Sequence, residues 1–246
     1  MGTSTSEFRN RRVLVTGSGK GIGRDLVTRL TGQGAQVIAL SRSVEDLASL
    51  QAENGCGVIV ADLEDTEAAA SAVRGILPVH GLVNNAGIVV LEPALDVTQD
   101  AFFRMMRVNT WAALRLAQVV AADWVARGEA GAIVNVSSLA SRVGLADHAG
   151  YCASKAALDA ITRVLAVEWG PHGIRTNSVN PVVTLTPMSE LAWSDPAKAG
   201  SMQSRIPMGR FVRPREVSDV VCFLLSDAAA MVNGVCLDVD GGFRAG

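Results

Sequence analysis

Seven short apolar runs, each separated from the next by a longer stretch with helical spacing, constrain the fold of this chain more than any other feature. The runs are rich in β-branched residues and lie at residues 12–16, 36–40, 57–60, 81–83, 132–137, 175–179 and 235–239. Several are apolar throughout, which is typical of strands buried on both faces of a parallel sheet. Helical patterns lie between them at residues 22–33, 44–53, 66–75, 99–127, 150–169 and 214–226. This order predicts an α/β fold, a doubly wound (Rossmann-type) seven-stranded parallel sheet with helices on both faces.

No repeat, low-complexity block or linker divides the sequence, so its 246 residues are interpreted as a single domain. Hydrophobic residues make up 49% of the chain, enough for a large buried core. Residues 1–10 are expected to form a flexible tail. Residues 181–213 contain Pro187, Pro196 and Pro207 and are too long for an ordinary connection. They are predicted to be an irregular segment that covers the substrate.

Charge and composition argue against several other classes of protein. A net charge of −2 and a pI near 5.9 give no electrostatic case for nucleic-acid binding. No apolar run approaches the ~18 residues that a membrane span requires, and no secretory signal pattern opens the chain. The three histidines are isolated from one another, so no metal site is expected. The four cysteines lack CxxC spacing and are interpreted as reduced thiols, which favours a cytoplasmic location.

A glycine-rich turn directly follows the first predicted strand. It reads Thr16-Gly17-Ser18-Gly19-Lys20-Gly21-Ile22-Gly23 and opens the first predicted helix. Glycines let the backbone approach a pyrophosphate, and a helix N-terminus offers unpaired N–H groups and the positive end of the helix dipole. The strand before the turn and the helix after it favour a dinucleotide site over a purely structural turn.

The end of the second predicted strand indicates which dinucleotide would bind. An NAD enzyme usually places an acidic residue about 20 residues after the glycine turn to bind the ribose. Here the strand ends at Ser41 and Arg42, which could bind a 2′-phosphate together with Lys20. Glu45 and Asp46 are expected to lie on the next helix, away from the ribose position. The pattern predicts NADP(H); the alternative is that Arg42 merely ends an exposed strand.

The only tyrosine, Tyr151, stands four residues before Lys155, one of three lysines in the chain. On a helix this spacing places both side chains on one face. A lysine ammonium beside a phenol favours the phenolate and lowers the tyrosine pKa from about 10. A phenol in that state can exchange a proton with a carbonyl or alcohol oxygen. By spacing alone, either Ser137 or Ser138 could be the serine that accompanies them.

Taken together, these residues resemble the short-chain dehydrogenase/reductase superfamily over nearly the whole chain. The matching motifs are, in the order of that family, Thr16-Gly17-x3-Gly21-Ile22-Gly23, Asn84-Asn85-Ala86-Gly87, Asn109, Ser138, Tyr151-x3-Lys155, Asn180-Pro181 and Asp240-Gly241-Gly242. The resemblance implies that Tyr151 is the general acid/base and that Ser138 polarises the substrate carbonyl. It further implies that Lys155 lowers the Tyr151 pKa and binds the nicotinamide ribose. Asn109 would hold a helix kink and a proton-relaying water.

The resemblance also implies a set of cofactor-binding positions. Asp62 would contact the adenine, and Thr184 would lie near the nicotinamide carboxamide. The full expected set is Gly17, Gly19, Lys20, Gly21, Ile22, Gly23, Ser41, Arg42, Asp62, Leu63, Asn85, Ala86, Gly87, Tyr151, Lys155, Pro181, Thr184 and Thr186.

Several segments narrow the resemblance to the L-xylulose/dicarbonyl reductase group, among them Tyr151-Cys152-Ala153-Ser154-Lys155, Gly170-Pro171-His172 and Trp193-Ser194-Asp195-Pro196. This implies reversible, NADPH-dependent reduction of a small ketose or α-dicarbonyl, of the L-xylulose to xylitol type. The implied substrate contacts are Ser138, Leu139, Leu145, His148, Tyr151, Trp193 and Met202. The chain departs from the pattern where Leu139 replaces an amide side chain, Asp147 replaces an asparagine, and Val182 follows Pro181 in place of glycine.

Three other functions remain open at this point: a 3-oxoacyl thioester reductase, a polyol dehydrogenase and a non-catalytic dinucleotide-binding protein. The last is disfavoured because all four catalytic positions are present. The group's members are homotetramers, and the two helical patterns at 99–127 and 150–169 carry more apolar residues than one sheet contact can cover. These apolar residues include Trp111, Leu114, Leu116, Val119, Val120, Leu158, Ile161, Leu165 and Val167, so part of the apolar surface is expected to be buried against a partner subunit.

Overall fold

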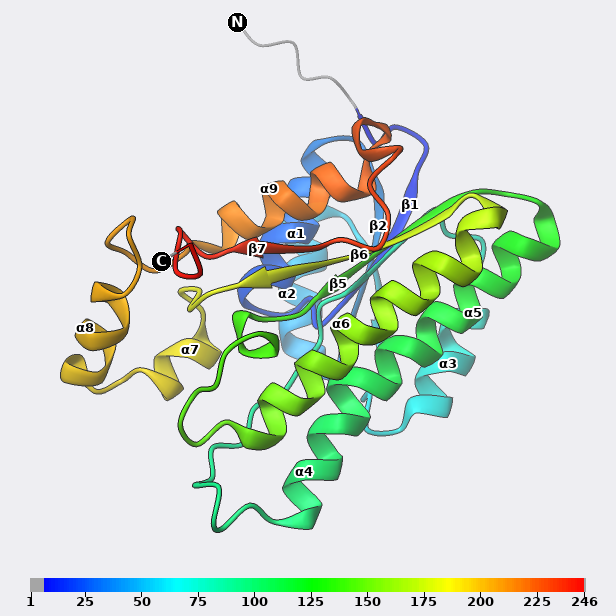
Figure 1. Cartoon of the computed structure of the whole chain (residues 1–246). Helices are drawn as coiled ribbons and strands as arrows, with labels where there is room; N and C mark the ends of the chain where they lie inside the picture. The colour runs from blue at the N-terminus through cyan, green and yellow to red at the C-terminus, as the bar shows by residue number, and fades with distance from the viewer. Residues whose placement is uncertain (1–6, 246) are drawn as a thin grey trace, which may run out of the picture.

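The computed structural model describes residues 7–245, which form a sheet between two layers of helices (Figure 1). The strands are β1 (Arg12–Thr16), β2 (Gln36–Ser41), β3 (Gly57–Val60), β4 (Gly81–Asn84), β5 (Gly131–Val136), β6 (Ile174–Pro181) and β7 (Cys236–Val239). Their order is β3-β2-β1-β4-β5-β6-β7, and every pair of neighbours is parallel. The predicted doubly wound seven-stranded sheet is therefore confirmed.

Helices cover both faces of this sheet (Figure 1). One layer holds α1 (Gly21–Gly32), α2 (Val44–Asn54) and α9 (Pro214–Leu225), and the other holds α3 (Thr66–Arg74), α5 (Ala112–Arg127) and α6 (Ala149–Trp169). Successive side chains of β1 alternate between the layers, since Val13 and Val15 pack into the first core and Leu14 into the second. This burial on two sides explains why the central strands are apolar throughout.

The strand order reverses between β1 and β4, because β2 and β3 extend to one side and β5 to β7 to the other. In such sheets the loops after the two central strands diverge, which opens a crevice at their carboxyl ends. Two short helices, α7 (Pro187–Ala192) and α8 (Pro196–Ser204), lie beyond this edge of the sheet (Figure 1).

The expectation that residues 181–213 are irregular is wrong. Thr186 and Ser189 form a reciprocal capping box at the start of α7, and the Asp195 side chain caps α8. Pro187 and Pro196 occupy the first turns of these helices. Proline is favoured there because its fixed φ suits a helix start and its missing N–H would have no partner. Two of the three prolines named in this segment therefore begin helices.

The helix expected over residues 99–127 is interrupted. It consists of α4 (Gln99–Met106), a π-helical turn (Arg107–Trp111) and α5. The interruption surrounds Asn109, which is buried, and single π-turns inside α-helices frequently mark functional sites.

The flexible tail expected at residues 1–10 does not extend to residue 8. Residues 1–6 lie outside the described residues, but Phe8 is buried in the core and its N–H donates to the Gln33 carbonyl oxygen at 3.2 Å. Burying an aromatic ring outweighs the entropy of ordering a few residues. Within residues 7–245, no helix combines the length and the apolar character that crossing a membrane requires.

Candidate active site

A cavity of about 550 Å³ lies at the carboxyl ends of the strands. Segments that follow β1, β2, β3, β4, β5 and β6 line it, as do the first turns of α6 and parts of α7 and α8. All the predicted site residues line this cavity except Gly23 and Asn109. The fold thus gathers residues from positions 17 to 202 around one space.

Gly17 and Gly23 shape the turn after β1. Gly17 has φ +63°, and a Cβ there would come within 2.6 Å of the Ala86 Cα. A Cβ at Gly23 would overlap the Gly17 carbonyl oxygen and lie 2.5 Å from Asn85 Nδ2. Gly23 therefore faces the turn behind the cavity and permits the close packing of α1, although it does not line the cavity.

Asn85 joins the glycine turn to the end of β4. Its Nδ2 donates to the Thr16 and Gly17 carbonyl oxygens, both at 3.0 Å, and its N–H donates to Thr16 Oγ1 at 3.1 Å. Ala86 N also donates to Thr16 Oγ1. These hydrogen bonds connect loops about 70 residues apart in sequence and hold the turn in one conformation.

Two cations and two carboxylates surround the end of β2. Lys20 Nζ lies 3.6 Å from Asp46 Oδ2, and an Arg42 guanidinium nitrogen lies 3.9 Å from Asp62 Oδ2. The Lys20 and Arg42 side chains are 66% and 62% exposed, so both contacts are loose surface ion pairs that a phosphate could displace. Asp46 lies on α2, as expected, but it lines the cavity and its carboxylate reaches the glycine turn.

Asn109 is held at the π-turn by hydrogen bonds to two other segments. Its Oδ1 accepts from Ile88 N at 2.8 Å, and its Nδ2 donates to the Ile88 carbonyl oxygen at 2.9 Å and to Ser154 Oγ at 3.0 Å. A Cβ at Gly87 would stand 3.3 Å from Asn109 Oδ1 and 3.4 Å from Lys155 Nζ. Asn109 thus lies next to Lys155, behind the cavity wall.

The first two turns of α6 bring Tyr151 and Lys155 to the cavity. Lys155 is buried, its Nζ donates to the Val136 carbonyl oxygen at 2.9 Å, and it lies 5.7 Å from the centre of the Tyr151 ring. Ser138, directly after β5, also lines the cavity. The adjacent Ser137 lines it as well, but its hydroxyl donates to the Lys155 carbonyl oxygen at 3.2 Å.

Burial dominates the ionisation of both groups on α6. It raises the pKa of Tyr151, while a hydrogen bond with the Ser138 side chain acts in the opposite direction. It also lowers the pKa of Lys155 to about 8, an effect that the charge of Asp159 partly offsets. The expected lowering of the Tyr151 pKa is therefore wrong for these residues alone, because burial of the phenol outweighs the hydrogen bond with Ser138.

The single tyrosine makes this balance directly measurable. We expect the absorbance of phenolate near 295 nm to rise in one step, with its midpoint above pH 10, because the folded protein disfavours the charged phenolate. Unfolding in denaturant should return the midpoint to about pH 10, and Tyr151→Phe should abolish the step. A midpoint well below pH 10 in the folded protein would contradict the burial argument.

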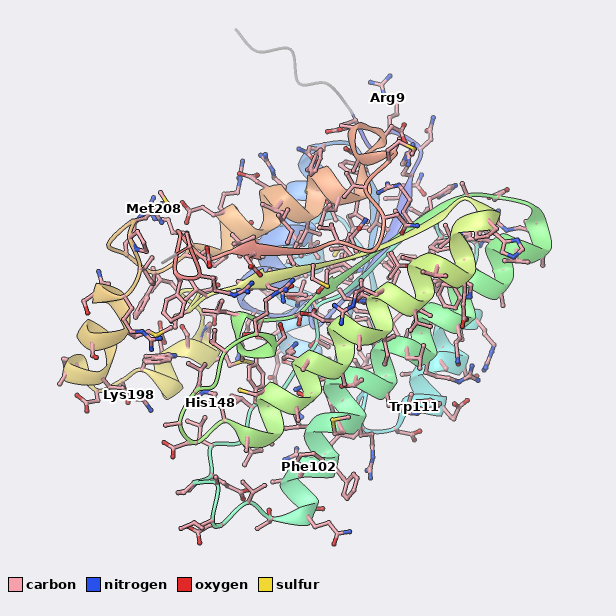
Figure 2. The ribbon with its side chains drawn as sticks, viewed as in Figure 1. Arg9, Phe102, Trp111, His148, Lys198 and Met208 are labelled. Carbon is pink, nitrogen blue, oxygen red and sulfur yellow. The ribbon has the colours of Figure 1, made fainter. Side chains whose placement is uncertain are left out.

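The outer wall of the cavity contains His148, Leu145, Trp193, Leu139 and Met202. Figure 2 labels His148 close to the start of α6, on the side of the molecule where α7 and α8 lie. Its Nδ1 lies 2.5 Å from the Ala146 carbonyl oxygen, and its ring packs edge-on against Tyr151 with centres 6.1 Å apart. Trp193 packs against Phe211.

Some lining residues were not predicted from the sequence. They include Asp46, Glu64, Ile88, Val182, Val183 and Met188. Most follow directly on a strand end or on a predicted residue. Ligands bind at the carboxyl ends of parallel strands. Including the three or four residues that follow each predicted strand would therefore have identified several of these residues.

Comparisons with known proteins agree with this geometry. Residues 17–244 match the family described as Enoyl-(Acyl carrier protein) reductase. The chain is 51% identical over 236 residues to L-xylulose reductase of Bos taurus, covering 96% of this chain and 97% of that protein. It is 49% identical over 237 residues to D-erythrulose reductase of Gallus gallus, covering 96% of each chain. To carbonyl reductase (NADPH) 2 of Sus scrofa it is 43% identical over 239 residues, covering 97% and 98%.

Solved structures show the same architecture. A gluconate 5-dehydrogenase from Burkholderia cenocepacia J2315, in complex with NADP and tartrate, superposes with a TM-score of 0.92 at 30% identity, covering 99% of this chain and 98% of that one. Levodione reductase superposes with a TM-score of 0.91 at 31% identity, covering 97% of this chain and 99% of that one.

Proposed function

The chain belongs to the short-chain dehydrogenase/reductase family and is an oxidoreductase; we propose that it is a single-domain, NADPH-dependent reductase of small ketoses. The observation that carries this proposal is the position of Tyr151. Its side chain lines the cavity together with Ser138, Lys155 and His148, with the Lys155 Nζ 5.7 Å and the His148 ring centre 6.1 Å from the centre of its ring. The high identity to L-xylulose and D-erythrulose reductases supports the same substrate class.

The residues present fit NADP(H). The turn at Gly17 leaves no room for a Cβ, so backbone N–H groups at the start of α1 are accessible to a pyrophosphate. Arg42, Ser41 and Lys20 lie together at the far end of the cavity, where a 2′-phosphate would lie. Asp62 and Leu63 would border the adenine, and Pro181, Thr184 and Thr186 the nicotinamide. When bound, the cofactor supplies the hydride.

The residues of the chain supply the remaining chemistry. Ser138 Oγ donates a hydrogen bond that polarises the substrate carbonyl. Tyr151 then donates its phenolic proton to the carbonyl oxygen, and its raised pKa keeps that proton in place at neutral pH. The Lys155 ammonium favours the phenolate that remains. Asn109 fixes the backbone beside Lys155 and would hold the water that returns a proton.

The tautomer of His148 favours a ketose over a dicarbonyl. In the neutral ring, Nδ1 must carry the proton to donate to the Ala146 carbonyl oxygen, which leaves Nε2 as an acceptor. A ketose hydroxyl can donate to this nitrogen, whereas a second carbonyl cannot. Leu139 cannot hydrogen-bond a sugar hydroxyl, but it disfavours sugar binding less than the sequence suggests. Only 2% of it is exposed, because it packs into the core.

The test follows NADPH consumption with L-xylulose, diacetyl and an acetoacetyl thioester side by side. We expect the highest kcat/KM for the ketose. His148→Phe should lower the ketose value about tenfold, the effect of one lost hydrogen bond, and leave the diacetyl value within about twofold. Preferential reduction of the thioester would instead identify a 3-oxoacyl reductase. Absence of turnover over a wide carbonyl and polyol panel would support a non-catalytic role.

We further propose a homotetramer that works in the cytoplasm, where its four unpaired cysteines stay reduced. Of the apolar residues on these helices, the chain itself already buries Leu116, Val119, Val120, Leu158 and Leu165. The apolar surface that remains around α4 to α6 includes Phe103, Trp111 and Val167, which are 54%, 47% and 77% exposed. Figure 2 labels Trp111 on this helical layer.

This surface predicts the effect of one substitution on the assembly. Light scattering should give a tetramer for the wild type, and Trp111→Glu should dissociate it, because a buried unpaired carboxylate is costly. Met231→Glu is a matched control, since Met231 is 96% exposed and lies outside α4 to α6. A wild-type mass of about 26 kDa would contradict the proposal.

A further inference from the structure

Asp159 is a buried carboxylate to which no step of the proposed reaction assigns a role. It lies on α6, one turn after Lys155, and is 4% exposed. Its Oδ1 accepts from Ser178 Oγ at 2.9 Å, and its Oδ2 accepts from Asn180 Nδ2 at 2.6 Å. Both oxygens act as acceptors, as suits the anion. A buried anion is costly unless hydrogen bonds and a nearby opposite charge compensate it.

One of these hydrogen bonds leads to the loop that carries Ser138. Asn180 Nδ2, which donates to Asp159, also lies 2.7 Å from Ser141 Oγ and 3.3 Å from the Ser138 carbonyl oxygen. Asn180 sits near the end of β6, next to the end of β5. The carboxylate thus fixes an amide that in turn contacts both ends of the short 3₁₀ turn after Ser138.

The opposite charge is Lys155. The two residues are spaced i, i+4 on α6, which places their side chains on one helix face. Burial shifts the Lys155 ammonium towards the neutral amine, and the charge of Asp159 acts against that shift. Among the described residues, Asp159 is the anionic group that raises the pKa of Lys155.

We propose that Asp159 is a positioning residue of this active site: its charge keeps Lys155 in the ammonium form, and its hydrogen bond to Asn180 fixes the backbone of Ser138. The expected effects on kcat rest on the reductase function proposed above. The expected effect of Asp159 on the protonation of Lys155 does not depend on that function.

Other titratable groups surround the pair and must be followed as well. Arg163 donates to Cys236 Sγ at 3.5 Å, and that thiol donates to the Asp159 carbonyl oxygen at 3.8 Å. The titratable and charged groups on the elements packed around Asp159 and Lys155 include Tyr151, Cys152, Arg163 and Glu168 on α6, Arg175 on β6, Cys236 and Asp238 on β7, Arg142 after the 3₁₀ turn, and Asp100, Arg104 and Arg107 on α4 and the π-turn.

The low lysine count allows a direct test. Protein labelled with ¹³C at the lysine Cε carbons should give three signals, from Lys20, Lys155 and Lys198, which Lys20→Arg and Lys198→Arg would assign. In the wild type, free of cofactor and substrate, we expect the Lys155 signal to titrate near pH 8. In Asp159→Asn its midpoint should fall by about one to two pH units, the effect of removing one charge at this spacing.

Ser178→Ala is the matched control, because it removes one hydrogen bond to Asp159 and leaves the charge in place. Its Lys155 midpoint should stay within a few tenths of a pH unit of the wild type. Should Asp159→Asn fail to fold, the double variant Asp159→Leu/Asn180→Leu removes the charge and its amide partner together and leaves no donor without an acceptor. An unchanged Lys155 midpoint in a folded variant that lacks the Asp159 charge would overturn the proposal. So would an equal shift in Ser178→Ala.

Kinetics test the contact with Ser138. With the best substrate of the carbonyl panel, Asn180→Leu should lower kcat at least tenfold, while the Lys155 midpoint and NADPH binding stay unchanged. Wild-type kcat in this variant would refute the Ser138 half of the proposal. Because the lysine titration needs neither cofactor nor substrate, its outcome is independent of whether the proposed reductase function is correct.

Discussion

Replacing Tyr151 with phenylalanine should lower kcat by about 10²–10⁴-fold, the typical contribution of a general acid. The phenol faces the cavity beside Ser138, whose side chain hydrogen-bonds it. Phenylalanine keeps the ring that packs against His148 and lacks only the hydroxyl group, which carries the proton that the carbonyl oxygen requires. The fold and the glycine turn should therefore remain intact.

Two measurements separate the loss of chemistry from the loss of binding. Fluorescence titration should give an NADPH dissociation constant within about threefold of the wild type, since the pyrophosphate and 2′-phosphate positions lie at other strand ends. Steady-state assays over pH 6–9 should show the low kcat throughout. Near-normal turnover at any pH in this range would remove Tyr151 from the catalytic role.

Replacing Arg42 with aspartate should erase the preference for NADPH over NADH. Arg42 follows directly on β2 and is mostly exposed at the cavity, where its loose contact with Asp62 leaves it free to bind a phosphate. One charge-assisted hydrogen bond contributes about 1.5–3 kcal/mol, or ten- to a hundredfold in affinity. An aspartate at position 42 would also repel the phosphate and could accept hydrogen bonds from the ribose hydroxyls of NADH.

The measured quantity is the ratio of kcat/KM for NADPH to that for NADH. We expect it to fall ten- to a hundredfold in Arg42→Asp and to stay unchanged in Arg9→Asp. Arg9 is exposed and precedes β1, at the end of the sheet opposite the cavity, as Figure 2 shows. The two variants change the net charge equally, so a long-range electrostatic effect would appear in both. A wild type that prefers NADH would refute the role given to Arg42.

The sequence by itself determined the sheet and most of the residues around the cavity. β1 and β3 begin and end at the predicted residues, and the other strands differ by a few positions. A buried strand is recognisable in the sequence because it is a short run of apolar residues. The carboxyl ends of all strands in a parallel sheet lie at the same edge, so motifs that follow different strands lie close together. This is why residues as distant as Gly17 and Met202 could be assigned to one site.

Only the tertiary structure decided the features that depend on contacts between residues distant in sequence. The amide of Asn109 in the π-turn binds the backbone of Ile88, 21 residues away, and Leu139 packs into the core, which leaves only 2% of it exposed. The direction of the Tyr151 pKa shift follows from how much water the folded chain excludes, which the Tyr151–Lys155 spacing does not encode. The contact of Asp159 with Asn180 likewise requires α6 to pack against β6. Sequence patterns indicate the local environment of a residue. Hydrogen bonds between distant segments and the exclusion of water from a buried group arise only when the chain folds, so the sequence alone did not show them.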